Sequence, residues 1–442
     1  MNFEWSDIQL GDFLELKRGY DLPHKDRKEG DYKVISSSGP SGFHSEGKVK
    51  GPGVVTGRYG TIGKVFYSER DFWPLNTTLY VKDFKGNHPE FVYYFLKTLD
   101  FLQYSDKAAV PGVNRNHLHT AWVKVPESAK VQERVAKFLS DLDRKITLNT
   151  QINQTLEQMA QALFKSWFVD FDPVIDNALE AGNPIPEPLA ERAERRQAMW
   201  AAGNESAHAR LPAEIRRLFP DSFEENEVLG WMPEGWKSKA VSQVLHINPK
   251  VKLPKNTVAK YADMKSIPTS GYMIDGVIEK PYSGGAKFES GDVLLARITP
   301  CLENGKTALV DFLEEDEIGF GSTEFVVMRG KGELGAPYVA CLARWGEFRK
   351  YCIQSMVGSS GRQRIQNASF DSFYVALPEN SELLTLFDQK CGASFRIMTE
   401  HRKQTETLTK LRDILLPKLL SGELQLPEAE AAVDTALEVE SV

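Results

Sequence analysis

The chain has 442 residues, which exceeds the size of one compact domain and predicts two to four domains. Its hydrophobic fraction of 41% and charged fraction of 26% are ordinary for a soluble globular protein, and no apolar run is long enough for a membrane span. The four cysteines lie in the second half without CxxC spacing, which argues against a zinc site or a disulfide framework. Because the N-terminus is unlike a secretory signal, we expect a cytoplasmic protein.

The formal net charge of −7 is unevenly distributed along the chain. Residues 1–125 carry a net charge of +2 and residues 236–378 a net charge of +3, whereas the remainder carries −12. A basic patch within a near-neutral module can neutralise phosphates, so the charge permits nucleic-acid binding without demonstrating it. Ordinary scatter of surface charge explains the same numbers.

Residues 1–126 predict a first module of short strands, glycine-rich turns and one or two short helices, of α/β or α+β class. Polar and basic side chains on loops of a rigid scaffold are the groups that read base edges. A plain surface or turn role stays open for each of them, although the clusters as a group favour DNA contact. The candidate DNA-binding residues of this module are Arg58, Tyr59, Lys64, Asn76, Thr77, Thr78, Asn114, Arg115 and His117.

Residues 127–171 predict a long amphipathic helix, because apolar side chains recur at spacings of three and four. At about 1.5 Å per residue, about forty residues form a rod of about 60 Å. Trp167 and Phe168 exceed what a two-helix seam needs, so they either face a partner or cap the core of a module. The candidate contacts with a second helix or a partner are Val135, Leu142, Asn149, Leu156, Met159, Leu163, Trp167 and Phe168.

Residues 172–235 are rich in Pro, Ala and Glu and predict a partly helical connector. Residues 236–378 predict a second module with a similar order of strands and turns. Its last polar cluster lies just before the final strand, as a cluster of the first module does. The candidate DNA-binding residues of the second module are Arg297, Lys306, Ser322, Thr323, Ser359, Arg362, Gln363 and Arg364.

Residues 379–424 predict a second long helix, and residues 425–442, rich in Ala and Glu, predict a disordered tail. The candidate contacts on this helix are Phe387, His401, Leu408, Leu411 and Leu415, with Ile397 at another seam position. Polar residues at the centre of the seam, Asn149 and His401, either set the register at some cost in stability or lie where the helices diverge.

The two long helices are copies of each other, since they align without a gap at an offset of 252 residues that pairs Val135 with Phe387 and Leu163 with Leu415. The modules match more weakly, as in GPGVVTGRYGTIGKVFY (51–67) and SGDVLLARITPCLENGKTALV (290–310). Because the second module must return the chain, we expect an antiparallel helix pair. Two unrelated amphipathic helices, each buried in its own domain, are the alternative.

No motif for catalysis assembles along the chain. Gly305-Lys306-Thr307 ends like a phosphate-binding loop, but Pro300 stands where such a loop requires its first glycine. A dinucleotide loop, a methyltransferase motif and a nuclease metal cluster are also absent from the sequence. We therefore assign no catalytic residue and no metal ligand.

Four runs then reveal a resemblance: FKSWFVDFDPV (164–174), LFPDSF (218–223), LGWMPEGW (229–236) and LLPKLLSGEL (415–424). Together with the duplicated plan, they resemble the specificity subunit of type I restriction–modification systems of bacteria and archaea. The resemblance implies two target-recognition domains, each reading half of a split double-stranded DNA target, and a pseudo-twofold internal repeat. It also implies that the long helices act as a spacer and bind two methyltransferase subunits.

The resemblance implies that the chain itself is non-catalytic and binds no cofactor. S-adenosylmethionine, ATP and Mg²⁺ are expected on the methyltransferase and restriction subunits of the complex. Two hypotheses from other classes compete with it. One is a stand-alone enzyme that uses an unrecognised site near Lys306 or His117, and the other is a helical scaffold without DNA contact.

Overall fold

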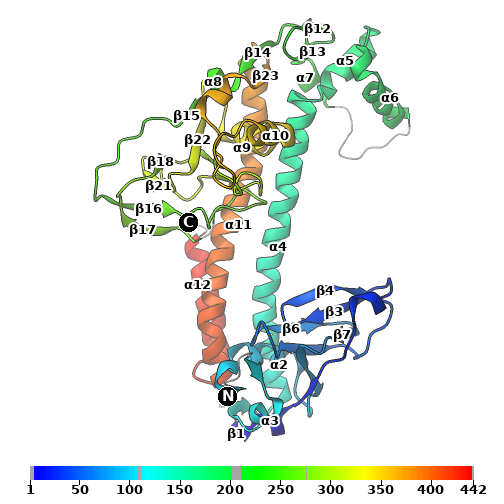
Figure 1. The fold of residues 1–442 in the computed structure, drawn as a ribbon, viewed down its shortest axis with the longest axis vertical. Coiled ribbons are helices and arrows are strands. Elements are labelled where there is room, and N and C mark those ends of the chain that lie inside the picture. Colours follow the sequence, from blue (N-terminus) through cyan, green and yellow to red (C-terminus); the bar gives the residue numbers. More distant parts are fainter. Residues whose placement is uncertain (1–3, 107–110, 202–210, 275, 441–442) are drawn as a thin grey trace. The chain divides into compact units, whose positions relative to one another are not determined.

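The structure, a computed structural model, describes residues 4–106, 111–201, 211–274 and 276–440. It contains two compact units, residues 1–148 with 403–442 and residues 149–402. The division falls inside two long helices, α4 (Ala129–Phe168) and α11 (Ser381–Ser421), which are labelled in Figure 1. Each unit therefore holds one module and one half of each long helix. The predicted fold class, two modules and two long helices arranged as an internal repeat, is confirmed.

The first module is built on a four-stranded antiparallel sheet of order β2-β8-β5-β6 and a three-stranded sheet of order β4-β3-β7. All residues of the apolar run of β5 are buried, which suits a central strand. The strands are β1 (Trp5–Gln9), β2 (Glu15–Arg18), β3 (Tyr32–Ser36), β4 (Gly39–His44), β5 (Gly53–Gly57), β6 (Val65–Ser68), β7 (Phe72–Pro74), β8 (Thr78–Asp83), β9 (Ser105–Asp106), β10 (Gly112–Val113) and β11 (Trp122–Pro126). The helices are α1 (Leu10–Phe13), α2 (Pro89–Thr98) and α3 (Arg115–His119), with 3₁₀ turns at His24–Asp26 and Phe101–Tyr104.

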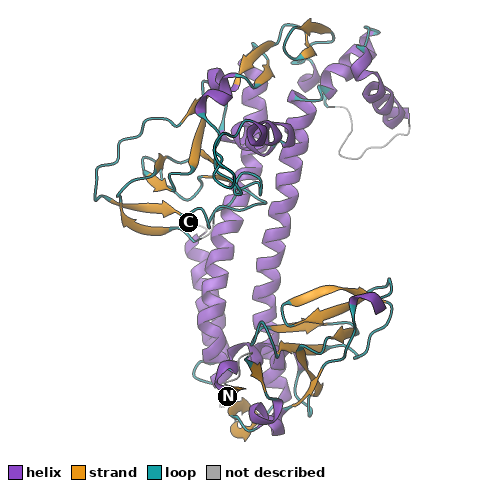
Figure 2. Cartoon of the chain, viewed as in Figure 1, coloured by secondary structure: helices purple, strands orange, loops and turns teal. Residues whose placement is uncertain are grey.

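The second module repeats this plan with sheets of order β15-β22-β19-β20 and β17-β16-β21-β18. Figure 2 draws the strands in orange and the helices in purple. In both modules the second sheet contains one parallel pair, β3 with β7 and β16 with β21. The strands are β14 (Lys237–Ala240), β15 (Leu245–Ile247), β16 (Val258–Ala262), β17 (Ile278–Pro281), β18 (Ala286–Phe288), β19 (Val293–Ala296), β20 (Thr307–Leu309), β21 (Gly319–Gly321), β22 (Phe325–Gly330) and β23 (Tyr374–Leu377). The helices are α8 (Val241–Val244), α9 (Ala336–Arg344) and α10 (Gly346–Gln354), with a 3₁₀ turn, η3, at Asn367–Asp371.

The two modules also begin alike. Residues 5–16 and 236–247 align without a gap and fold in both cases as strand, short helix and strand, namely β1-α1-β2 and β14-α8-β15. The first strand pairs antiparallel with the last, β1 with β11 and β14 with β23. The repeat therefore extends to the first residues of each module, where sequence analysis did not detect it.

In the first unit, the beginning of α4 packs against the end of α11. Val135 and Leu419 line one small pocket, and Arg412 of α11 lies 2.7 Å from the carboxylate of Asp143 on α4. Later residues of α4 thus meet earlier residues of α11, so the two segments are antiparallel here. Asp143 also accepts a hydrogen bond of 2.8 Å from the hydroxyl of Tyr94 on α2, which ties the module to both helices.

In the second unit, the end of α4 packs antiparallel against the beginning of α11. The rings of Phe168 and Phe387 lie 5.1 Å apart, and Asn153 donates a hydrogen bond of 3.0 Å to the carbonyl of Met398. Nδ1 of His401 lies 3.0 Å from Oδ1 of Asn153, and Asn149 is buried, so polar groups occupy the interior of this helix pair.

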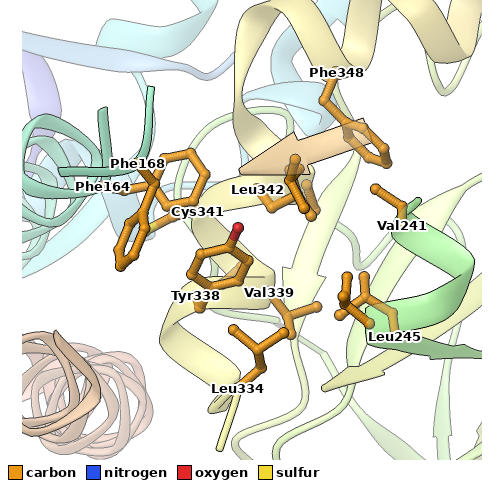
Figure 3. Packing of buried hydrophobic residues seen from close by; sticks show 14 of the residues in the cluster. Phe164, Phe168, Val241, Leu245, Leu334, Tyr338, Val339, Cys341, Leu342 and Phe348 are labelled. Atoms are coloured by element: carbon orange, nitrogen blue, oxygen red, sulfur yellow. The ribbon is translucent and has the colours of Figure 1, made fainter. Parts of the chain in front are cut away.

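Trp167 and Phe168 belong to the core of the second unit. Both are buried, and Phe168 packs edge-to-face on Tyr338 of α9 at 5.1 Å. Figure 3 shows Phe164 and Phe168 of the long helix beside Tyr338 and the apolar residues of the module. Of the two roles left open by the sequence, the structure shows the capping of the module core.

The register of the buried helix face differs from the heptad prediction. Met159 and Ile397, predicted at the seam, are 59% and 40% exposed, whereas Ala160 and Met398 are buried in their place. The cause is that these helix segments also pack against the second module, where Phe395 lies 5.2 Å from Tyr272. A face shared between a helix and a module follows the period of 3.6 rather than a strict heptad.

The prediction of a disordered tail is wrong, since residues Leu426–Glu440 form helix α12. Its apolar residues Leu426, Ala429 and Val433 recur at spacings of three and four and are buried in the core of the first unit. Composition alone misled the prediction, because a high content of Ala and Glu suits a short docked helix as well as a disordered segment.

A left-handed residue follows each long helix: Gly422, with a φ of 75°, comes directly after α11, and Phe171, with a φ of 55°, lies three residues after the end of α4, where it caps α5. The first tryptophan of a module packs there in each unit. Trp236 lies 5.8 Å from the ring of Phe171, and a Cβ at position 422 would lie 2.5 Å from Trp5.

The connector contains α5 (Asp172–Ala181), α6 (Glu187–Ala201) and α7 (Ala213–Arg216), followed by the hairpin of β12 (Phe223–Asn226) and β13 (Gly230–Pro233). Buried carboxylates of α5 meet arginines of α6. Arg192 donates hydrogen bonds of 2.6 and 2.9 Å to Asp172, and Arg196 pairs with Asp176.

Candidate nucleic-acid interface

A basic cleft of about 510 Å³ opens in the first module, hereafter the first cleft. It forms where the end of β2, the loop after β5 and the turn before α3 converge. Its lining carries four cationic side chains and no carboxylate. The lining residues are Lys17, Arg18, Gly19, Tyr20, Arg58, Leu79, Asn114, Arg115 and Asn116.

The backbone holds Arg58 firmly at the cleft. Its N–H donates to the carbonyl of Thr77 at 2.9 Å, and its carbonyl accepts from the N–H of Val113 at 3.0 Å. The guanidinium lies over the ring of Tyr59, 4.5 Å from the centroid. Such stacking orients a guanidinium while leaving its N–H donors available to a ligand.

Asn114 acts as the N-cap of α3. Its side-chain oxygen accepts a hydrogen bond of 3.0 Å from the N–H of Asn116, as N-cap residues do. The cap fixes the start of the helix, and Arg115 follows on its exposed first turn. A capping role thus explains Asn114, while Arg115 extends into solvent at the cleft.

Tyr20 forms part of the cleft wall. Its hydroxyl lies 2.9 Å from that of the buried Tyr80, and Lys17 lies 5.5 Å from its ring centroid. The hydrogen bond with Tyr80, acting against burial, lowers the pKa of Tyr20, and Lys17 contributes in the same direction. Burial raises the pKa of Tyr80 above its usual range, and the bond to Tyr20 adds to this effect.

A second cleft of about 430 Å³ opens in the second module, hereafter the second cleft. It forms beside β15 and η3, the counterparts of β2 and α3, but it shares with the first cleft only the positions equivalent to Arg18, Arg115 and Asn116. Its lining includes one lysine, Lys331, one carboxylate, Asp371, and one histidine, His246. The lining residues are Ser242, Leu245, His246, Ile247, Pro249, Lys331, Asn367, Ala368 and Asp371.

The backbone around Arg297 repeats that around Arg58. The N–H of Arg297 donates to the carbonyl of Glu324 at 2.9 Å, and its carbonyl accepts from the N–H of Ile365 at 3.0 Å. Its guanidinium donates a further bond of 2.8 Å to the carbonyl of Ile365. Arg58 and Arg297 are therefore equivalent positions with different side-chain environments.

Two pairs of hydrogen-bonded side chains distinguish the second module from the first. Nε of Arg364 donates to both carboxylate oxygens of Glu324 at 3.0 and 2.9 Å. Asn248 donates to the side-chain oxygen of Asn367 at 3.1 Å and accepts from the N–H of Val327 at 2.9 Å. The hydrogen bond of Glu324 with Arg364, acting against burial, lowers the pKa of Glu324.

The structure brings only some of the predicted DNA-binding residues together. Arg58, Asn114 and Arg115 line the first cleft, and Tyr59 and Thr77 support it. The remaining candidates of the first module lie outside the lining of this cleft, namely Lys64, Asn76, Thr78 and His117.

Two candidates have structural bonds that explain them. The hydroxyl of buried Thr78 donates to the carbonyl of Leu75 at 2.7 Å, and the ammonium of Lys306 donates to the carbonyl of Met264 at 2.6 Å. Lys306 thus braces the second module from inside, which accounts for the Gly-Lys-Thr run. In the second module, Thr323, Ser359 and Arg362 are exposed, whereas Ser322, Gln363 and Arg364 are half-buried.

Sequence reasoning missed Lys17, Arg18 and Tyr20 in the first module and His246 and Asn367 in the second. The ungapped match of residues 5–16 with 236–247 was the available signal, because it places residues 17–20 and 248–251 at equivalent positions.

Comparison with known proteins gives a consistent result. The family model described as the type I restriction modification DNA specificity domain matches residues 2–158. The HindI specificity subunit of Haemophilus influenzae is 26% identical over 360 residues, covering 76% of this chain and 77% of that protein. The MjaIX specificity subunit of Methanocaldococcus jannaschii is 22% identical over 358 residues, covering 77% of this chain and 70% of that protein.

The chain is thus similar to the specificity subunits of type I restriction–modification systems, and residues 2–158 match their DNA specificity domain. A solved specificity subunit from M. genitalium shares its fold, with a TM-score of 0.58 and 13% identity over 95% of this chain and 96% of that one. Among the described residues of this chain, no helix is long and apolar enough to cross a membrane, and no group of three metal-binding side chains is present.

Proposed function

We propose that this specificity subunit reads a bipartite, asymmetric DNA target, one half through each module. The observation that carries the proposal is the repeated backbone arrangement around Arg58 and Arg297, which presents different side-chain environments in the two modules. A repeated scaffold with divergent linings suits the reading of two different half-sites. Base-edge recognition requires such polar side chains on a rigid frame.

The long helices would recruit two methyltransferase subunits, and through them the restriction subunits. Four large apolar side chains on α4 and α11 are exposed, namely Leu148, Met159, Ile397 and Ile414. An apolar helix face that is left exposed is a surface to which another protein can dock. S-adenosylmethionine, ATP and Mg²⁺ would then be bound by the partner subunits, and this chain would act without a catalytic residue or cofactor of its own.

Methylation mapping tests the proposal directly. The chain is co-expressed with its cognate methyltransferase in a host that lacks this activity, and N6-methyladenine is mapped across the genome. We expect one split motif that disappears when the chain is omitted. Exchange of residues 1–126 for another first module should change one half-site and preserve the other. A motif that stays the same after the exchange, or methylation without the chain, contradicts the proposal.

A further inference from the structure

The first cleft and the equivalent positions of the second module differ in charge. The first cleft is lined by Lys17, Arg18, Arg58 and Arg115. The ungapped match of the module beginnings, the shared backbone bonds of Arg58 and Arg297, and the common offset of α3 and η3 give the counterparts of these residues as Asn248, Pro249, Arg297 and Asn367. Three of the four cationic positions thus become uncharged, whereas one exposed cation, Lys250, stands at the position of Gly19.

Apart from Lys250, the cations at or beside these positions form hydrogen bonds within the protein. The guanidinium of Arg297 donates to the carbonyl of Ile365, and the ammonium of Lys331 donates to the carbonyl of Ser242 at 2.8 Å. Arg364 forms its hydrogen bonds with the carboxylate of Glu324. The positions equivalent to this last pair in the first module are Gly112 and Thr77, so the first module lacks the neutralising carboxylate.

Cations of the first cleft have weaker internal partners. Arg18 lies 3.6 Å from Asp21 in a pair whose side chains are both more than half exposed, and such pairs contribute little. The guanidinium of Arg58 is stacked on Tyr59, and this geometry leaves its in-plane N–H donors available to a ligand. Arg115 is exposed on the first turn of α3.

We propose that the first cleft is the main phosphate-binding anchor of the subunit, and that the equivalent positions of the second module, Asn367 above all, read bases chiefly through neutral groups. This inference rests on the proposed DNA-binding function and divides it unequally between the modules. Cations that neutralise phosphates release counterions, so they determine how steeply DNA affinity falls with salt. Amide side chains such as that of Asn367 recognise base edges and contribute little to the salt dependence.

The test exchanges equivalent residues between the clefts. Binding of the full-length chain to a duplex of scrambled sequence is measured by fluorescence anisotropy over a series of KCl concentrations. Arg115→Asn should reduce the slope of log K against log salt by about one unit, because each phosphate contact contributes about 0.9. Asn367→Arg should steepen the slope by about the same amount, since it introduces the missing cation.

Three controls accompany this exchange. Arg115→Lys should retain the wild-type slope, because it retains the charge. Asn367→Ala should leave the slope unchanged while altering one half-site of the methylation motif. Lys137→Ala removes a cation of α4 that pairs with Asp141, outside both cleft linings, and should leave the slope unchanged.

The outcomes separate this inference from the function on which it rests. The division between the clefts is overturned if Arg115→Asn leaves the salt slope unchanged, or if Asn367→Ala and Arg115→Asn reduce that slope equally. Either result counts against the division even if the methylation motif remains bipartite. Absence of any DNA binding by the wild-type chain and its complex would instead remove the proposed function. Circular dichroism spectra matching the wild type exclude misfolding as the cause of a changed slope.

Discussion

Replacement of Arg329 by methionine tests how the central sheet of the second module tolerates a buried charge. Arg329 of β22 donates two hydrogen bonds, of 2.6 and 2.8 Å, to the carboxylate of Asp292, which is fully buried. The substitution keeps most of the aliphatic volume and removes the guanidinium. The N–H of Glu289 still donates to Asp292 at 2.9 Å, but one neutral donor is a poor substitute for a bidentate cation.

Removal of one partner from a buried ion pair typically costs about 3–5 kcal/mol. We expect this loss for Arg329→Met, and a smaller loss for Asp292→Asn, whose amide oxygen still accepts from Glu289. The double variant should cost less than the sum of the single variants by about 0.5–3 kcal/mol, because the two changes remove one shared interaction.

Urea unfolding followed by circular dichroism measures these losses, and hydrogen exchange of residues 290–296 locates them in the second module. Lys350→Met is the matched control, since Lys350 forms an exposed pair with Glu347 at 3.8 Å and should cost about 0–1 kcal/mol. If Arg329→Met costs no more than this control, or if the two losses are additive, the buried pair does not stabilise the sheet as argued.

Three further results are expected. Phe387→Ala should lower the free energy of unfolding by about 3–5 kcal/mol and Ile397→Ala by no more than about 0.5, and similarly large losses for both variants in urea unfolding would restore the heptad register. Val433→Ala should cost about 2 kcal/mol if α12 is docked, and an unchanged unfolding midpoint would contradict its docking. Burial raises the pKa of Asp172, but the hydrogen bonds from Arg192 and the other interactions of the carboxylate together outweigh burial and leave the pKa below its ordinary value. The ionised Asp172 therefore stabilises the folded state fully above the ordinary carboxyl pKa, and this contribution is lost as the pH falls through the lowered pKa of the folded protein. Arg192→Met should therefore move acid unfolding, followed by circular dichroism, to higher pH, and an unmoved transition would refute the coupling.

The long helices and the duplication could be predicted from the sequence, because amphipathic periodicity is a local property of the chain. The choice between Met159 and Ala160 as the buried residue could not, since it depends on the module that packs against the helix. The tail was misjudged for the same reason. Its apolar residues Leu426, Ala429 and Val433 become meaningful only beside the core that they cover.

The first cleft was only partly foreseen. Arg58 and Arg115 were predicted from the polar clusters of the sequence that contain them. Lys17 joins them only through the pairing of β2 with β8, which the sequence does not show. Thr78 and Lys306 looked suitable for DNA contact by residue type, yet their polar atoms are bonded to carbonyls inside the modules. Residue type indicates what a side chain is able to bind, whereas strand pairing and local bonds decide whether it is available.

The packing of Trp5 on Gly422 has a consequence for the exchange of first modules. A substituted module must fit helices that it did not evolve with, since Trp5 meets the end of α11 and Tyr94 shares Asp143 with Arg412. A module with a bulkier residue at this corner, or without the tyrosine hydroxyl, would pack poorly on the two helices. Steric compatibility at a helix end therefore limits which modules this chain can accept.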